Sequence, residues 1–140
     1  LDLGGTSQTV TGLSGIGCVS NGTLTVSGPL TPGGGAIGAM TLMTDTVLNG
    51  ATLLFDTASD GSCDRIDVQG SLSISQTVLT IQNEALLAPG KRYLIATFPP
   101  GMLTGTMTPA FTSATKWMIN ANTETGELSL TSRGLLFMIQ

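Results

Sequence analysis

The chain has 140 residues, of which 41% are hydrophobic and only 10% are charged, and its formal net charge is -4. This length is enough for one domain with its own core, and a negative surface excludes nucleic acid and anionic membrane as main partners. Because 19 residues are Gly and most polar positions hold Thr or Ser, the composition favours short strands and turns over long helices. No apolar run approaches the ~18 residues of a membrane-spanning helix, so we expect no membrane span.

The first third of the chain alternates apolar and polar residues. Residues 23–28 read TLTVSG, as a half-buried strand requires, and the Asn21-Gly22 pair before them predicts a turn. Residues 29–35, PLTPGGG, are poor in backbone donors and rich in Gly, which predicts a loop. The pattern is already under way at Leu1, so we expect the chain to be a piece of something longer.

The middle of the chain contains the strongest turn signal. Asn49-Gly50 separates an apolar run at 39–48 from another at 52–55, and Asn-Gly in this setting is typical of a β-hairpin.

Further strands follow at shorter intervals. The alternation shifts phase near Val78-Leu79, which predicts a bulge or corner there. No segment keeps a period of 3.6 residues, so we expect no long helix. Apolar runs predict the remaining strands at 65–68, 72–82, 93–98, 116–120, 128–130 and 134–140.

These runs together resemble a known repeat. The stretches LDLGGTSQTVTGLSGIG, GTLTVSGPLTPGG, LNGATLLFDTASDGSCDRIDVQGSLSIS and PGKRYLIATF are similar to the autotransporter-associated β-strand repeat of bacterial surface proteins. The resemblance covers residues 1–105, and residues 106–140 resemble the closing strands of such arrays. It implies a secreted or surface-displayed passenger with a right-handed parallel β-helix. Gly and Asn at regular corners suit such a stack of rungs.

The same residues allow another all-β arrangement. Both Asn-Gly pairs are also suited to antiparallel hairpins, so a β-sandwich is the alternative to the solenoid fragment with closing antiparallel strands. In either case residues 1–140 form a single domain. Exposed strand edges predict self-association, as a homodimer or edge to edge.

Residue types that the chain lacks exclude several kinds of catalytic and binding site. The chain has no His, which excludes Ser-His-Asp and Cys-His nucleophiles and His-ligated metals. The Gly run at 33–35 lacks the following Lys of a phosphate-binding loop. Cys18 and Cys63 are too few for a structural zinc site, and they form either one disulfide in an oxidising compartment or two free thiols. We expect no metal and no cofactor.

Residues 53–59, LLFDTAS, resemble the Asp-Thr-Gly-Ser signature of aspartic proteases. The resemblance makes Asp56 the catalytic acid and base, with Thr57 bracing the loop and Ser59 hydrogen-bonded to the carboxylate. This chemistry needs two carboxylates that share a proton, so a chain with one such loop has to dimerise. Ala58 departs from the signature, which has Gly there, and no second aliphatic signature follows.

The same carboxylates also have interpretations that do not involve peptidase activity. Asp56 and Thr57 end a strand and Asp60-Gly61 makes the next turn, which the β-repeat explains without catalysis. Asp56, Asp60, Asp64 and Asp67 could also bind Ca²⁺, although they lack the spacing of a calcium-binding loop. Two carboxylates of the chain could instead form a glycosidase pair. Trp117 and Tyr93 are predicted to lie in the core rather than to stack on sugar.

Two functions are therefore predicted. The first is a structural or adhesive β-repeat module of a secreted bacterial surface protein, with an extracellular protein or glycoprotein as its partner. The second is a dimeric aspartic endopeptidase that degrades extracellular protein or mucin glycoprotein through Asp56.

Overall fold

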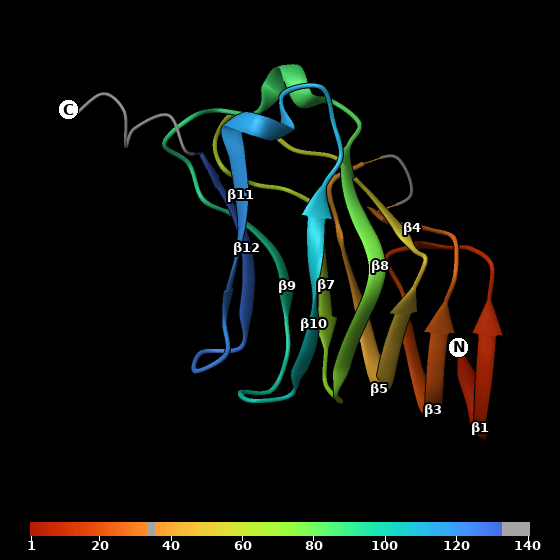
Figure 1. Cartoon of the computed structure of the whole chain (residues 1–140). Coiled ribbons are helices and arrows are strands. Elements are labelled where there is room, and N and C mark those ends of the chain that lie inside the picture. Colours follow the sequence, from red (N-terminus) through yellow and green to blue (C-terminus); the bar gives the residue numbers. More distant parts are fainter. Residues whose placement is uncertain (34–35, 133–140) are drawn as a thin grey trace.

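The computed structural model describes residues 1–33 and 36–132, and this part of the chain is all-β (Figure 1). Its twelve strands belong to one mixed sheet. Two short 3₁₀ helices, η2 (Glu84–Leu86) and η3 (Ala114–Lys116), lie in loops. The strands are β1 (Asp2–Val10), β2 (Leu13–Gly15), β3 (Cys18–Val26), β4 (Pro29–Pro32), β5 (Ala39–Asn49), β6 (Thr52–Phe55), β7 (Arg65–Val68), β8 (Leu72–Ile81), β9 (Tyr93–Thr97), β10 (Leu103–Pro109), β11 (Trp117–Asn122) and β12 (Glu127–Ser132). The strand predicted at 134–140 lies outside the described residues.

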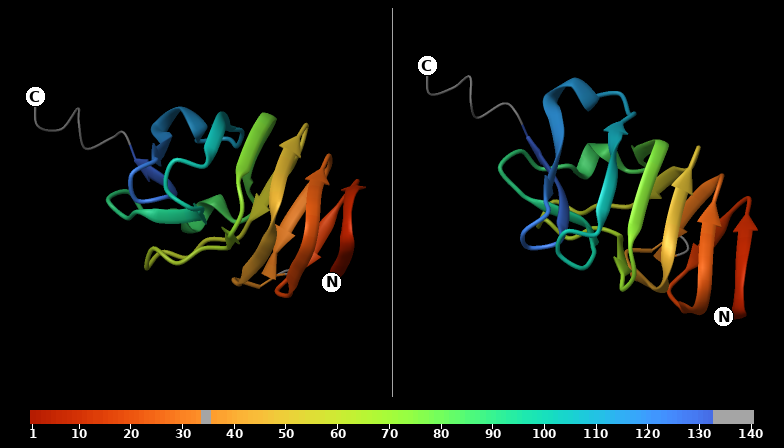
Figure 2. Two further views of the ribbon diagram at one scale, coloured as in Figure 1. Left: turned by 90° about the horizontal axis from the view of Figure 1, so that it is seen from below. Right: turned by 60° about the horizontal axis from the view of Figure 1, so that its bottom comes forward.

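Most neighbouring strands run parallel. One parallel series joins β1, β3, β5, β7 and β9, and a second joins β2, β4, β6, β8 and β10. Figure 2 shows β1, β3 and β5 side by side, beginning at the N-terminal end. The antiparallel pairs are β9 with β12 and β12 with β11, at the other end of the sheet.

The register keeps apolar residues in line from strand to strand. Leu30 pairs with Leu53, and Leu53 pairs with Leu79. Met40 likewise pairs with Ile66 on the neighbouring series. All five side chains are buried, because residues paired in a parallel ladder point to the same side of the sheet. The alternation in the sequence therefore becomes a continuous apolar interior.

The core includes the two largest aromatic residues of the chain. Tyr93 is 1% exposed and Trp117 is 3% exposed, and their rings meet edge to face with centroids 5.9 Å apart. This burial confirms their predicted place in the core. The contact packs the start of β9 against the start of β11 and so attaches the antiparallel strands to the parallel ones.

The hairpin predicted at Asn49-Gly50 does not form. The strands on either side, β5 and β6, pair with other strands, and all of those pairs are parallel. Gly50 has φ +69°, so the pair makes a corner between two strands of different series. Asn21, with φ 64°, makes a similar bend inside β3, where a turn between two strands was expected. Asn-Gly supplies the positive φ that either kind of turn needs, and the tertiary pairing decides between them.

The loop predicted at 29–35 is wrong for its first four residues, which form β4. Pro29 and Pro32 occupy the first and last positions of this strand. Between them, Leu30 and Thr31 keep their backbone N–H groups, and Leu30 is fully buried in the ladder between β2 and β6. Proline is compatible with a strand at such terminal positions.

The structure also shifts one predicted corner and shows the state of the two cysteines. The corner expected near Val78-Leu79 lies a little earlier, at Gln76, which has φ 50°. Cys18 is exposed, Cys63 is half-buried, and both are free thiols. No helix within residues 1–33 and 36–132 combines the length and apolar character that crossing a membrane requires.

Candidate functional site

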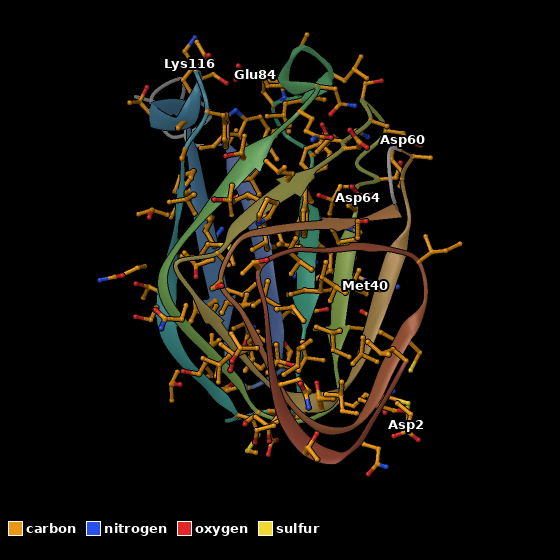
Figure 3. The ribbon with its side chains drawn as sticks, turned by 90° about the vertical axis from the view of Figure 1, so that its right-hand side faces the viewer. Asp2, Met40, Asp60, Asp64, Glu84 and Lys116 are labelled. Carbon is orange, nitrogen blue, oxygen red and sulfur yellow. The ribbon has the colours of Figure 1, made fainter. Side chains whose placement is uncertain are left out.

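Residues 56–64, which contain the sequence that resembles a protease signature, form the loop between β6 and β7. They lie at the same end of the strands as three other connections, 36–38, 82–92 and 110–116, and we call these four segments the loop face. Figure 3 shows Asp60, Asp64, Glu84 and Lys116 together at this end of the molecule. The geometry of this face decides what the carboxylates can do.

The 56–64 loop is closed by backbone bonds. Thr57 and Cys63 form an antiparallel bridge, and the Asp64 N–H donates to the Asp56 carbonyl oxygen over 2.9 Å. The tip is held by a bond of 2.8 Å from the Ala58 N–H to the Ser62 carbonyl oxygen. The loop therefore has a defined conformation with Asp56 and Asp64 at its two ends.

Asp64 lies at the base of the loop and is fully buried. Its Oδ2 accepts a hydrogen bond of 2.9 Å from the Asp56 N–H, and its Oδ1 accepts one of 2.8 Å from the Gly38 N–H. Both oxygens are thus committed to backbone donors from two different loops. This carboxylate holds the loops together and offers no free oxygen surface to a substrate.

The environment of Asp64 disfavours its charged form. Burial raises the pKa of this carboxyl group above its usual value, and the charge of Asp56 adds to the increase. The two N–H bonds from Asp56 and Gly38 lower the pKa but do not cancel the effect of burial. The carboxyl group of Asp64 therefore holds its proton more strongly than an exposed carboxyl group does.

Asp56 directly follows β6 and is half-buried. Its Oδ2 is buried and has no hydrogen-bond partner among the described residues. Buried carboxylate oxygens are normally paired, and this atom is the one buried side-chain oxygen of the 56–64 loop that lacks a partner among the described residues. A proton donor, from a substrate, a water molecule or a second chain, would satisfy it.

Thr57 is buried and is held by Asn83 of the next loop. The Asn83 Oδ1 accepts bonds from the Thr57 N–H over 2.7 Å and from its hydroxyl over 3.1 Å, and the Asn83 Nδ2 donates to the Thr57 carbonyl over 2.6 Å. The Thr57 side chain thus fixes the loop to its neighbour. Asn83 provides the complementary group in all three bonds.

Ser59 and Asp60 form the exposed tip of the loop. The Asp60 Oδ1 accepts bonds from the N–H and the hydroxyl of Ser62, and these bonds lower the pKa of the Asp60 carboxyl group. Ser59 does not donate to the Oδ2 of Asp56, which has no partner. The structure therefore places Asp56 and Thr57 at the base of the loop and Ser59 in solvent.

Cys63 does not provide a nucleophile. Its thiol donates to the Leu94 carbonyl oxygen over 3.2 Å, and burial raises the pKa of the thiol to about 12. A thiol with this pKa stays protonated at neutral pH, whereas a reactive cysteine needs the thiolate.

The other carboxylates of this region are engaged elsewhere. Asp67 pairs with Arg65 over 2.7 Å, and Glu84 accepts bonds from the N–H and the hydroxyl of Ser113. Within residues 1–33 and 36–132, no three Asp, Glu, Cys or His side chains gather in a group suited to a metal ion. Asp56, Asp60, Asp64 and Asp67 therefore do not form a calcium site of three or more ligands.

The sequence did not reveal the role of Asn83 or the hydrogen bond between Gly38 and Asp64. A signal for both exists, since Thr57 and Asn83 are 26 residues apart, and so are Gly38 and Asp64. The Asp45 side chain also accepts from the N–H of Ser71, 26 residues later. The separation of 26 residues is set by the pairing of the strands, so it identifies these contacts only once that pairing is known.

Comparisons of the chain with protein-family models, with curated proteins and with solved structures found no match.

Proposed function

We propose that this chain is a structural or adhesive module of a secreted bacterial surface protein, built as a right-handed parallel β-helix of the autotransporter-repeat kind. The observation that supports it is that β5 and β6 both pair with strands 26 residues later, so that one rung is followed in register by the next. Met40 pairs with Ile66, and Leu53 pairs with Leu79. The hydrogen bond between Gly38 and Asp64 has the same offset.

Strand, corner and loop thus share one offset between these two rungs, as stacking of one rung on the next requires. In such a stack each rung contacts only its neighbours, so rungs can be added without altering the rest. The length of a rung can vary where loops connect the strands, and the loop face carries these variations. A module of this kind extends a protein along one axis and presents long, repetitive sides to the outside.

Insertion of one additional rung tests the proposed architecture. A copy of residues 39–64 placed between Asp64 and Arg65 adds one period in register, because Ala39 pairs with Arg65. We expect the lengthened chain to unfold in one cooperative transition, at a urea concentration no lower than the original. The control is an insertion of the same 26 residues in scrambled order, which should abolish the folded state. Equal damage from both insertions would refute the stacked arrangement.

The adhesive function needs a separate measurement. An extracellular protein or glycoprotein is the partner class, so the probes are immobilised mucin and immobilised fibrous matrix protein. We expect saturable binding of the folded chain, and loss of this binding after unfolding in urea. Absence of binding to all probes would leave a purely structural module.

A second candidate function rests on the unpartnered Oδ2 of Asp56. In a dimeric aspartic endopeptidase, this oxygen would share a proton with Asp56 of a second copy, and one carboxyl would activate water while the other protonates the substrate carbonyl. The substrate class is an extracellular protein or mucin glycoprotein.

Cleavage of mucin or an unfolded protein at acidic and neutral pH tests this candidate, with and without an aspartic-protease inhibitor. The expected result is cleavage by the original chain that is lost in Asp56→Asn and retained in Asp60→Asn, a matched change at the exposed tip of the loop. Cleavage that survives Asp56→Asn would exclude the peptidase assignment.

A further inference from the structure

The hairpin formed by β11 and β12 has two faces of opposite character. Figure 1 shows these strands side by side at the end of the sheet away from β1. One face carries Trp117 and Leu130, which are buried in the core. The other face carries Asn120 directly opposite Ser129. Because successive residues of a strand point to opposite sides, the polar side chains of this hairpin gather on the face away from the core.

A hollow of about 540 Å³ opens on this polar face, and we call it the hairpin hollow. Sites for small ligands usually measure about 300–1,000 Å³, so the space is sufficient for one. Its lining is unlike that of an ordinary apolar pocket, because Ala121 has the one apolar side chain among the described residues that line it. The polar side chains of the hollow include Arg92, Asn120, Asn122, Glu124, Ser129 and Thr131.

Ser129 is the one buried residue in this lining, with 4% of its surface exposed. In the register it lies between Asn120 of β11 and Leu94 of β9. Its hydroxyl group forms no hydrogen bond with any other described residue, although it can donate one and accept two. Among the described residues, the Oδ2 of Asp56 is the one fully sealed side-chain oxygen without a partner, so the Ser129 hydroxyl opens on the hollow. A partner for this buried hydroxyl group has to come from the hollow.

The two asparagine side chains beside Ser129 are held in place and keep hydrogen-bonding capacity. The Asn120 Nδ2 donates to the Thr131 hydroxyl over 2.7 Å, which leaves its second N–H and its Oδ1 without a partner among the described residues. The Asn122 Oδ1 accepts bonds from the N–H groups of Glu124 and Thr125, which leaves its Nδ2 in the same state. The hollow therefore offers donors and acceptors together, on a hairpin whose ladder fixes their positions.

The charges around the hollow favour a neutral ligand. The Arg92 Nη2 lies 3.0 Å from the Oε1 of Glu127, so this guanidinium group is already paired with a carboxylate. Glu124 adds a second carboxylate to the lining. An anionic ligand would meet one more negative charge than positive charges, and this repulsion disfavours its binding. A ligand with many hydroxyl groups and no charge fits both the field and the mixture of donors and acceptors.

We propose that the hairpin hollow binds a neutral saccharide of an extracellular glycoprotein. The inference rests on the proposed function, because it assigns the binding site of the adhesive module. Each sugar hydroxyl donates one hydrogen bond and accepts others, so neighbouring hydroxyl groups of one ring can bond to Ser129 and to the amides of Asn120 and Asn122. No aromatic side chain is among the described residues that line the hollow, so binding depends on hydrogen bonds and is expected to be weak and reversible.

Titration of the folded chain with galactose, N-acetylglucosamine and N-acetylneuraminic acid, followed by backbone amide NMR spectra, tests the proposal. We expect saturable shifts with a neutral sugar, confined to Arg92 and residues 118–131, and none with the acidic sugar. Ser129→Ala should weaken binding about three- to tenfold. It should leave the free energy of unfolding unchanged, because no hydrogen bond among the described residues is lost. Ser73→Ala makes the same change on β8, outside the hollow, and should bind as the original does.

Several outcomes would overturn this site. They are the absence of shifts with both neutral sugars, shifts on another surface, and undiminished binding by Ser129→Ala. Stronger binding of N-acetylneuraminic acid would overturn the neutral class of ligand. Retention on immobilised mucin that the neutral sugars do not compete would mean that the adhesive module binds through another surface. The insertion of residues 39–64 reports on the rung architecture independently, so failure of this site and failure of the proposed function are distinguishable.

Discussion

Removal of the Asp64 carboxylate is expected to destabilise the fold strongly, although the charge itself is unfavourable. In Asp64→Ala the N–H groups of Asp56 and Gly38 both lose their acceptor in a buried site. At ~1 to 3 kcal/mol for each unsatisfied donor, the gross cost is about 2 to 6 kcal/mol. Relief of a buried charge near Asp56 offsets part of it, and we expect a net loss of about 2 to 4 kcal/mol in the free energy of unfolding.

Asp64→Asn separates the two contributions. The amide keeps one acceptor oxygen and removes the charge, but its Nδ2 faces a backbone donor. One unsatisfied donor costs ~1 to 3 kcal/mol, so we expect Asp64→Asn to be about 1 to 2 kcal/mol less destabilising than Asp64→Ala. Urea denaturation with a two-state fit measures the difference.

The pH dependence gives a signature that simple loss of packing cannot produce. Because the pKa of Asp64 is raised in the folded state, its stability contribution is largest below the unfolded value of 3.8 and is lost as pH rises through the folded pKa. The stability deficit of Asp64→Asn should therefore shrink as pH increases from 3.8 upward.

Asp60→Asn is the matched control for this titration. The pKa of Asp60 is lowered, so its contribution is present above pH 3.8 and is lost as pH falls through the folded pKa. The deficit of Asp60→Asn should therefore grow as pH increases, opposite to that of Asp64→Asn. The same trend in both variants, or a deficit of Asp64→Ala below 1 kcal/mol, would refute the role assigned to Asp64.

Five further substitutions, two of them matched controls, test the packing and the loops by urea denaturation. Leu53→Ala should lower the free energy of unfolding by about 2 to 5 kcal/mol, because this side chain is fully buried. Leu54→Ala, on the other side of the strand, should lower it by under about 1.5 kcal/mol. Equal losses would contradict the assigned faces of the strand. Gly105→Ala should abolish folding, because its Cβ would overlap a carbonyl group of β8. Gly50→Ala is the control, since Gly50 has a similar φ but lies in open space, and it should lower the free energy of unfolding by about 1 to 2 kcal/mol. Asn83→Ala removes three hydrogen bonds and should cost about 2 to 4 kcal/mol; a loss under 1 would exclude it as the brace of the loop.

The candidate site shows where sequence reasoning reached its limit. The alternation of residues and the Asp-Gly turn predicted correctly that a strand ends at this point before a tight loop, although β6 ends at Phe55 and Asp56 directly follows it. The partner of each loop residue could not be predicted, because Asp64 and Asn83 act on groups 26 residues away. Such contacts depend on which strands become neighbours, and local pattern does not contain that information.

The sequence by itself determined that the chain is all-β and which side chains are buried, because period-two alternation places every second residue on one face of a strand regardless of its partner. Only the tertiary structure decided that Asn49-Gly50 is a corner between parallel strands and that Pro29–Pro32 enters the ladder. A turn needs only a local backbone conformation, whereas the direction of the next strand follows from long-range burial of the apolar faces.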